Sequence, residues 1–203
     1  QWYLDKTDFN MDVETSLRTM MQSINDFKAT LDKSYIGYSF APLINKAIRA
    51  GASNVALSIV INNPSEISKL KQYAKLQQEV IEKVCNVITV SPETGLRVLL
   101  PRRFTQPTIM LDIGQFNVSP NYSGVIASRL GGDNNKNAAV YIMENGLCRG
   151  SFRGKHKDVN YREYFENYSN DIYAQGHPGA FGFRLKKEQL DYLMNNISSI
   201  EPS

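Results

Sequence analysis

The chain has 203 residues and a formal net charge of +3, and 42% of its residues are hydrophobic and 21% charged, a composition typical of a globular protein. Two cysteines and two histidines, at spacings unlike those of paired zinc ligands, exclude a zinc finger or ribbon. No apolar stretch approaches the roughly 20 residues of a membrane span and no signal peptide opens the chain, so we expect a cytoplasmic protein with reduced thiols.

The first part of the chain has helical patterns. Apolar residues spaced three and four apart predict an amphipathic helix over Asp12–Leu31. The segment Ile36–Gly51 contains glycine and proline, which predicts a loop leading into a short helix. A capping Asn63, Pro64 at the first helical position and Glu66 three residues after the cap then predict the start of a helix of about 20 residues.

The composition changes between Ser91 and Pro107 to proline, glycine, threonine and arginine, which predicts a domain boundary. Beyond it, Thr108–Leu111 and Ala138–Met143 are predicted strands, and the fully apolar second strand is expected to be central. A last helix is predicted over Lys186–Ile197. The fold class is therefore α/β (α+β), with a helical connector at residues 1–90, a boundary loop at 91–107 and an α/β domain at 108–203.

The net charge is too small to indicate nucleic-acid binding, but the charge distribution is uneven. From Gly146 to Lys157 the chain carries Arg149, Arg153 and Lys155 with no acidic residue between them, interleaved with glycines. The pattern predicts a flexible cationic loop, which is either a solvated surface segment or a phosphate-binding one. Aromatic residues follow it closely and suit base stacking, although residues 161, 164, 165 and 168 also have the spacing of a helix packing its apolar face.

Four short stretches are notable for their order and spacing: IGYSFAPLINKAIR at 36–49, GVIASRL at 124–130, RGSFRG at 149–154 and QGHPGAFG at 175–182. Together they resemble the C-terminal half of RecJ-type single-stranded-DNA exonucleases of the DHH superfamily. The resemblance departs from the family pattern at Lys46 and Ile48, which replace Ala and Gly, at Gly154, which replaces Ser, and at Gln175, which replaces Gly.

The resemblance implies a linker helix followed by a mixed-sheet DHH-associated domain. DHH enzymes hydrolyse phosphodiesters with two metal ions, held by Asp and His side chains of a separate N-terminal domain that includes an Asp-His-His triplet. This sequence has no such triplet, so we expect no catalytic residue and no metal site in this chain. Mn or Mg is expected in an upstream DHH domain, present in cis or in trans. The start at Gln1 instead of Met indicates a processed chain or a piece of a longer one.

The resemblance also implies which residues contact nucleic acid or phosphate. Asn45 and Arg49 would share one helix face, with the alternative that Arg49 has only a local polar partner. Ser151 and Arg153 would bind a terminal phosphate from a glycine-flanked turn. The segment Gly124–Leu130 would open a helix whose first amides face an anion. The complete expected set is Asn45, Arg49, Ser128, Arg129, Ser151, Arg153, Lys155, Gly176 and His177, and His177 would also complete the catalytic cleft.

The leading hypothesis is that the chain binds single-stranded DNA and its 5′-phosphate as the C-terminal portion of a RecJ-like 5′-to-3′ exonuclease of DNA repair and recombination. The chain by itself is expected to be inactive as a nuclease. Two alternatives remain open: a DHH-associated module of a nanoRNase or cyclic-dinucleotide phosphodiesterase, and a non-catalytic module that binds a replisome protein.

Overall fold

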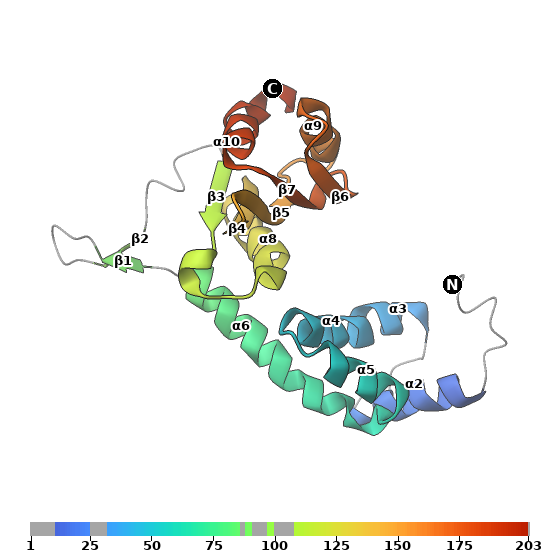
Figure 1. The fold of residues 1–203 in the computed structure, drawn as a ribbon. Coiled ribbons are helices and arrows are strands. Elements are labelled where there is room, and N and C mark those ends of the chain that lie inside the picture. Colours follow the sequence, from blue (N-terminus) through green and yellow to red (C-terminus); the bar gives the residue numbers. More distant parts are fainter. Residues whose placement is uncertain (1–10, 25–31, 86–87, 91–96, 100–107, 203) are drawn as a thin grey trace. The chain divides into compact units, whose positions relative to one another are not determined.

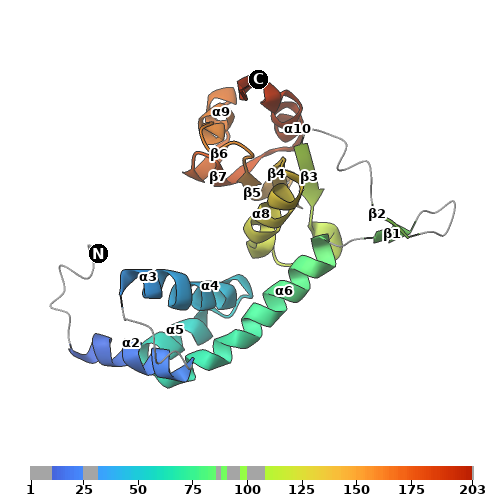
Figure 2. The same ribbon diagram turned by 180° about the vertical axis from the view of Figure 1, so that it is seen from behind.

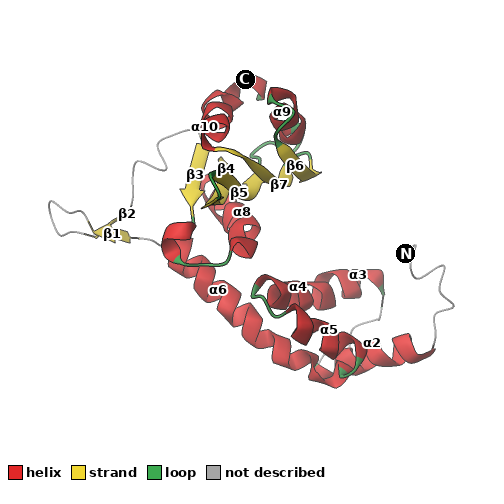
Figure 3. Ribbon diagram, viewed as in Figure 1, coloured by secondary structure: helices red, strands yellow, loops and turns green. Residues whose placement is uncertain are grey.

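The computed structural model describes residues 11–24, 32–85, 88–90, 97–99 and 108–202 (Figure 1). The chain divides into two compact units, Gln1–Glu79 and Val80–Ser203. The first is helical and the second is built on a five-stranded sheet, so the α/β fold class is confirmed (Figure 3). The limits predicted from composition, 1–90, 91–107 and 108–203, stay a prediction, and most of 91–107 lies outside the described residues. None of the helices in these ranges has the length and apolar character of a membrane-crossing segment.

The first unit consists of helices that enclose one small core. Its elements are α2 (Met11–Ser23), α3 (Lys33–Tyr35), the π-helical turn η1 (Ile36–Phe40), α4 (Ala41–Arg49), α5 (Ser53–Ile61), the 3-10 helix η2 (Pro64–Leu70) and the start of α6 (Lys71–Cys85). The loop predicted from Ile36 is wrong, because residues 36–40 are helical. Phe40 is buried there and its ring meets the Tyr35 ring edge-on, with centroids 5.1 Å apart.

Two other helix predictions for this unit need correction. The first predicted helix ends at Ser23, and residues 25–31 of the predicted span lie outside the described residues. The helix predicted from Asn63 does begin there, but its first seven residues are a 3-10 helix and the Asn63 side chain makes no capping hydrogen bond. Ile67 and Leu70 are both fully buried, and the three-residue period of a 3-10 helix is what places two residues three apart on one side.

The second unit is a mixed sheet with helices on both faces. Its strands are β3 (Thr108–Asp112), β4 (Asn137–Glu144), β5 (Leu147–Arg153), β6 (Tyr173–His177) and β7 (Ala180–Lys186), in the order β3-β4-β5-β7-β6. The β3–β4 pair is parallel, and the other three pairs of these strands are antiparallel. The two predicted strands are confirmed, and β4 is internal as expected. A separate antiparallel pair joins β1 (Ile88–Val90) to β2 (Arg97–Leu99).

The helices of this unit form two layers around the sheet. Helix α8 (Ser123–Asn134) lies against β4 and β5 on one face, whereas α9 (Tyr161–Tyr168) and α10 (Lys187–Asn196) lie on the other, as Figures 1 and 2 show from opposite sides. Short 3-10 helices precede α8 and follow α10: η3 (Gly114–Phe116), η4 (Pro120–Tyr122) and η5 (Ile197–Ile200).

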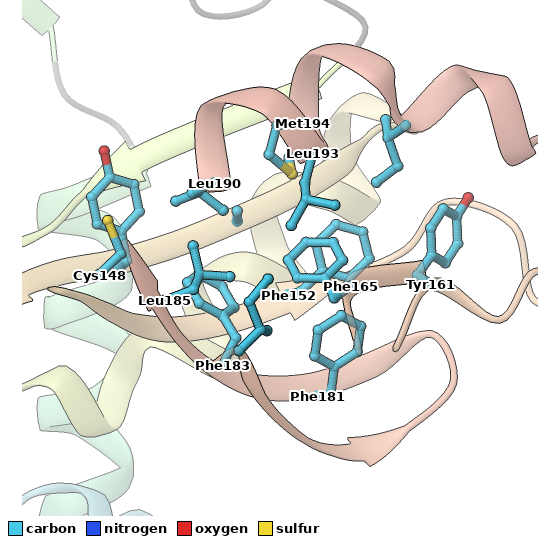
Figure 4. Packing of buried hydrophobic residues seen from close by; sticks show 14 residues of the cluster. Cys148, Phe152, Tyr161, Phe165, Phe181, Phe183, Leu185, Leu190, Leu193 and Met194 are labelled. Atoms are coloured by element: carbon cyan, nitrogen blue, oxygen red, sulfur yellow. The ribbon is translucent and has the colours of Figure 1, made fainter. Parts of the chain in front are cut away.

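An aromatic cluster forms the core between the sheet and the layer of α9 and α10 (Figure 4). The Phe152 ring lies 5.1–5.3 Å from the rings of Tyr161, Phe165 and Phe181. Helix α10 contributes Leu190, Leu193 and Met194, all with no exposed surface, which confirms the inner face predicted for the last helix. Burial on this scale, about 1.5–3 kcal/mol per large apolar side chain, fixes which side of each strand faces inward.

The cationic segment predicted as a flexible loop is instead strand β5 up to Arg153. Asn145 and Gly146, with φ values of 52° and 77°, form the two-residue turn that reverses the chain from β4 into β5. Cys148 and Phe152 then enter the core, and hydrogen bonds to β4 and β7 hold the strand on both sides. Gly150 allows this pairing, because a Cβ there would stand 2.1 Å from the Val140 carbonyl oxygen.

We therefore predict that Gly150→Ala destabilises the folded chain by about 1–3 kcal/mol, the usual cost of forcing atoms into a packed site. The obstacle is backbone, which cannot move aside as a side-chain tip could. Urea unfolding followed by circular dichroism measures the change. Gly132→Ala in α8 is the matched control: a Cβ there meets nothing within 4 Å, so that variant should be as stable as the wild type or more so. Equal stabilities for the two variants would contradict the prediction.

Candidate nucleic-acid interface

Strand β5 presents its polar side chains on the face of the sheet that α8 partly covers. Because side chains alternate along a strand, the burial of Cys148 and Phe152 on one face directs Arg149, Ser151 and Arg153 to the other. The hydrogen bonds that Arg153 donates to Ser128 and that Ser151 shares with Ser123, both residues of α8, confirm this orientation. The sheet register therefore brings two of the predicted site residues against the helix formed by a second predicted stretch.

Five residues form what we call the serine–arginine cluster: Ser123, Gly124, Ser128, Ser151 and Arg153. Arg153 Nε donates to Ser128 Oγ at 2.9 Å, and Nη1 donates to the Phe152 carbonyl at 2.7 Å. Ser128 Oγ itself donates to the Gly124 carbonyl at 2.8 Å. The hydroxyls of Ser123 and Ser151 lie 2.9 Å apart. The guanidinium is thus held in one orientation by the first turns of α8 and by its own strand.

The absence of a side chain at Gly124 lets two donor groups come close to the first turn of α8. A Cβ on Gly124 would stand 2.9 Å from Arg153 Nη2 and 3.5 Å from Ser151 Oγ. A guanidinium nitrogen and a hydroxyl therefore lie near each other beside this glycine. Planar N–H groups beside a hydroxyl near a helix start are the donors that bind phosphate oxygens. The first amide of α8 is already used, since Ser123 N–H donates to the Pro120 carbonyl.

A hollow of about 220 Å³ adjoins the serine–arginine cluster. It is lined by Ser123 and Ser151 of the cluster, by Arg149, and by Pro120, Asn121 and Gly150. The lining thus offers two hydroxyls and a cation. These groups suit an anion with several oxygen acceptors.

The hairpin of β6 and β7 extends the same face of the sheet. Residues directly opposite on paired strands share a face, and the register pairs Arg153 with Ala180 and Ala180 with His177. One row farther along, Ser151 pairs with Gly182 and Gly182 with Gln175. The small residues of β7 leave a shallow floor between β5 and the exposed side chains of β6. His177 and Arg153 lie on one row, about 10 Å apart at two strand spacings.

Two groups of contacts hold the turn after His177 in place. Gly154 N–H donates to the Gly179 carbonyl at 2.8 Å, which ties the end of β5 to the turn. Arg162 at the start of α9 donates its backbone N–H to the Pro178 carbonyl at 3.0 Å and its Nη1 to the Gly176 carbonyl at 2.8 Å. Gly176 has a φ of 140°, a conformation that side chains rarely adopt. The structure therefore gives Gly176 a backbone role beside His177.

A buried polar network fixes the segment that carries Lys155. The Lys155 N–H donates to Asn137 Oδ1 at 2.7 Å, and the His156 N–H donates to the Tyr161 hydroxyl at 3.3 Å. Tyr161 donates in turn to Glu201 Oε1 at 2.8 Å, and the Asn137 amide donates to the same oxygen. Burial, together with the hydrogen bond to Glu201, raises the pKa of Tyr161 to about 12. The Lys155 side chain is therefore attached to a held backbone.

The remaining predicted residues have their own local contacts. Arg129 forms an ion pair with Asp133, 2.6 Å between Nε and Oδ2, on the outer side of α8. In the first unit, Arg49 Nη1 donates to Gln77 Oε1 at 3.2 Å, the local polar partner considered as an alternative, and Asn45 is exposed on the same helix. Their roles in binding stay predictions. Of the aromatics in α9, Tyr161 and Phe165 are fully buried, so they pack the core.

Ser123 and Arg184 belong to this face but were not among the predicted site residues. Arg184 lies on β7 between the buried Phe183 and Leu185. The strict alternation of apolar and other residues over Ala180–Lys186 is a strand signal that indicates an outward Arg184. For Ser123 the sequence has no comparable signal, because its role depends on the Ser151 hydroxyl of a strand 28 positions later.

The described residues do not form a metal centre. Within them, no group of three or more His, Cys, Asp or Glu side chains lies close enough together to hold a metal ion. The donors on the α8-covered face are instead hydroxyls, guanidinium groups and an imidazole. These groups suit binding of an anion, and we derive no metal-dependent step from them.

Comparison with solved structures identifies a common fold. RecJ from Thermus thermophilus in complex with Mg²⁺ aligns with a TM-score of 0.61 and 17% identity, over 92% of this chain and 29% of that chain. Exonuclease RecJ bound to manganese aligns with a TM-score of 0.57 and 17% identity, over 92% of this chain and 46% of that chain. The DHH domain of a member of a ribosomal-protein family aligns with a TM-score of 0.50 and 14% identity, over 96% of this chain and 52% of that chain.

Neither a scan of protein-family models nor a search of curated proteins gives a match. At the low identities of the structural matches the likeness is one of fold. The RecJ-like fold that the four sequence stretches led us to expect is confirmed. The chain spans 29% of the magnesium-bound RecJ and 46% of the manganese-bound one, so it corresponds to part of those proteins.

The raised pKa of Tyr161 predicts a loss of stability at high pH. A tyrosine in the unfolded chain ionises near pH 10, whereas folded Tyr161 keeps its proton to about pH 12. Stability is therefore full below pH 10 and falls as the pH rises from 10 to 12. Between about pH 8 and pH 11 the free energy of unfolding should fall in both proteins, and the fall should be smaller in Tyr161→Phe than in the wild type by about 1 kcal/mol. Urea unfolding at both pH values tests this, and parallel pH profiles would contradict it.

Proposed function

We propose that the second unit of this chain binds single-stranded DNA and its terminal 5′-phosphate, as the substrate-binding portion of a RecJ-like 5′-to-3′ exonuclease. The serine–arginine cluster holds the phosphate. The strand then runs across the face of β5, β7 and β6, with His177 beside it. Hydrolysis of the phosphodiester, and the Mn or Mg that it requires, belong to a DHH domain outside the described residues.

One observation carries this proposal: Arg153 Nη2 and Ser151 Oγ lie together beside Gly124, 2.9 and 3.5 Å from where its Cβ would stand. A terminal phosphate carries more negative charge than an internal phosphodiester and presents three oxygens, so it gains more from a fixed guanidinium than an internal group does. The guanidinium is already oriented by Ser128 and by the Phe152 carbonyl. Little side-chain freedom is therefore lost on binding, which favours affinity.

The surroundings of the cluster support a single strand in preference to a duplex. The floor of the face is made of Ala180 and Gly182, and the exposed Tyr173 and His177 border it. Aromatic rings beside cations bind unstacked bases, because every base has a π-face that can stack on a ring. Lys155 adds a cation on a held backbone just after the end of β5. Binding through these groups does not depend on the base sequence, as expected for an exonuclease that degrades strands of any sequence.

Arg153→Ala should weaken binding of a 5′-phosphorylated oligothymidylate by roughly 10- to 100-fold, since hydrogen bonds to charged groups are worth about 1.5–3 kcal/mol. Binding of the same oligonucleotide with a 5′-hydroxyl should change far less. Fluorescence anisotropy with a 3′-labelled strand at fixed salt measures both affinities.

The matched control for Arg153→Ala is Lys187→Gln, which removes one positive charge from α10 on the opposite face of the sheet. It should leave both affinities unchanged. An equal loss for phosphorylated and unphosphorylated strands in Arg153→Ala would mean that the cluster does not bind the terminal phosphate. Tighter binding of a dinucleotide than of a longer strand would favour the nanoRNase-like alternative.

Gly124→Ala should weaken binding of the 5′-phosphorylated strand without lowering stability. The added Cβ would stand 2.9 Å from Arg153 Nη2, so the guanidinium must shift from its position beside Ser151 Oγ, which costs little because it is the tip of a flexible side chain. Alanine is favoured over glycine inside a helix by about 1 kcal/mol, so the melting temperature should stay the same or rise. Thermal melting and anisotropy on one sample separate the two effects. Unchanged affinity would show that the position of the guanidinium beside Gly124 does not matter for phosphate binding.

A further inference from the structure

We propose that Arg149, Arg184 and Tyr173 form a second contact for the same single strand, which binds an internal phosphodiester and stacks its base. This inference rests on the proposed function, because it takes the serine–arginine cluster as the site of the 5′ end. The three residues lie side by side on β5, β7 and β6, in one row of the sheet register.

The two arginines are like charges in direct opposition. Arg149 pairs with Arg184 across β5 and β7, and side chains directly opposite on antiparallel strands have Cβ atoms about 4.5–5.5 Å apart. Like charges at such positions destabilise a sheet. Glu144 offsets part of this repulsion, with its Oε2 3.3 Å from Arg149 Nη1. Within the described part of the chain no carboxylate pairs with Arg184. An anion bound between the two guanidinium groups would remove the repulsion.

The space for such an anion is a surface hollow of about 580 Å³. Arg149, Arg184 and Tyr173 line it, together with Gly150, Gly182 and Phe183. Gly182 lies on the same face of the sheet as the two arginines and has no side chain, so a ligand backbone can approach the sheet closely there. Tyr173 is 51% exposed and its hydroxyl donates to the Gln175 side-chain oxygen, so the ring is accessible for stacking. A phosphodiester with its adjoining base fits this combination of cations and ring.

The hollow is next to the one beside the serine–arginine cluster. Arg149 and Gly150 line both, so the two hollows share a wall on β5. Arg149 lies four residues from Arg153 along the strand, about 13 Å at roughly 3.3 Å per residue. A terminal phosphate in the cluster therefore cannot reach Arg184, but a strand of a few nucleotides can reach both. The second contact should act on oligonucleotides and not on mononucleotides.

The test compares Arg184→Gln with the wild type in binding 5′-phosphorylated hexathymidylate and thymidine 5′-monophosphate, the latter as a competitor. Affinity for the hexanucleotide should fall about tenfold, and the slope of log K against log salt should decrease by about 0.7, the value for one phosphate contact on a single strand. The inhibition constant of the mononucleotide should not change. A hexanucleotide affinity and salt slope equal to those of the wild type would overturn the second contact.

Tyr173→Leu tests the stacking separately. It should weaken binding of the hexanucleotide by roughly 5- to 100-fold, the range for loss of one base–aromatic stack. Tyr173→Phe should retain wild-type affinity. On a phosphorylated strand of abasic residues, Tyr173→Leu should have no effect. An equal loss on the abasic strand, or a loss in Tyr173→Phe as large as in Tyr173→Leu, would overturn the stacking role.

The outcome for Arg153→Ala distinguishes failure of this inference from failure of the proposed function. If Arg153→Ala weakens binding of the phosphorylated hexanucleotide while Arg184→Gln does not, only the second contact is wrong. If the wild type does not bind the hexanucleotide, or Arg153→Ala has no effect, the proposed function and the second contact both fail. Melting temperatures equal to that of the wild type verify that each variant is folded in the binding measurements.

Discussion

The burial of Phe152 is the constraint on which the rest of the second unit depends. Its ring is fixed by Tyr161, Phe165 and Phe181 at 5.1–5.3 Å, so β5 has one permitted orientation. The side-chain period of a strand is two, and a slip of one residue would move every side chain to the opposite face. The aromatic cluster therefore decides that Arg153 meets α8 on the other side. A stability requirement and the geometry of the proposed phosphate site follow from the same packing.

Glycines decide how close the parts of this face come to one another. Gly150 permits β5 to pair with β4, because its missing Cβ would overlap the Val140 carbonyl. Gly124 permits the approach of a side chain, because its missing Cβ would stand 2.9 Å from Arg153 Nη2. Both belong to stretches that resemble RecJ, but a sequence pattern does not distinguish a glycine that lets two strands pair from one that lets a side chain approach a helix. Only the positions of the neighbouring atoms make that distinction.

The sequence predicted the elements whose signal is local and missed those that depend on distant contacts. The strand at Ala138–Met143 and the inner face of the last helix were predictable, since apolar periodicity specifies both. Strand β5 was not, because glycines and cations at Gly146–Lys157 are the composition of a loop. That segment is a strand because Phe152 packs against α9 and β7, and because β4 and β7 supply its hydrogen bonds. The resemblance predicted Ser151 and Arg153 as site residues despite the wrong secondary structure, and that role stays a prediction, whereas Ser123 and Arg184 entered the candidate site only through the register of the sheet.

A sheet face that stays open for a ligand must be stabilised from its other side. Beyond β5, the α8-covered face presents Ala180, Gly182 and the exposed Arg184, none of which adds much apolar burial. The same strand buries Phe181, Phe183 and Leu185 on the opposite face, each no more than 2% exposed. At about 25 cal/mol per Å² of apolar area, these three side chains supply the stability that the open face does not. The concentration of aromatic residues under α9 and α10 is thus the condition that allows a row of charged and small residues to remain accessible on the other side.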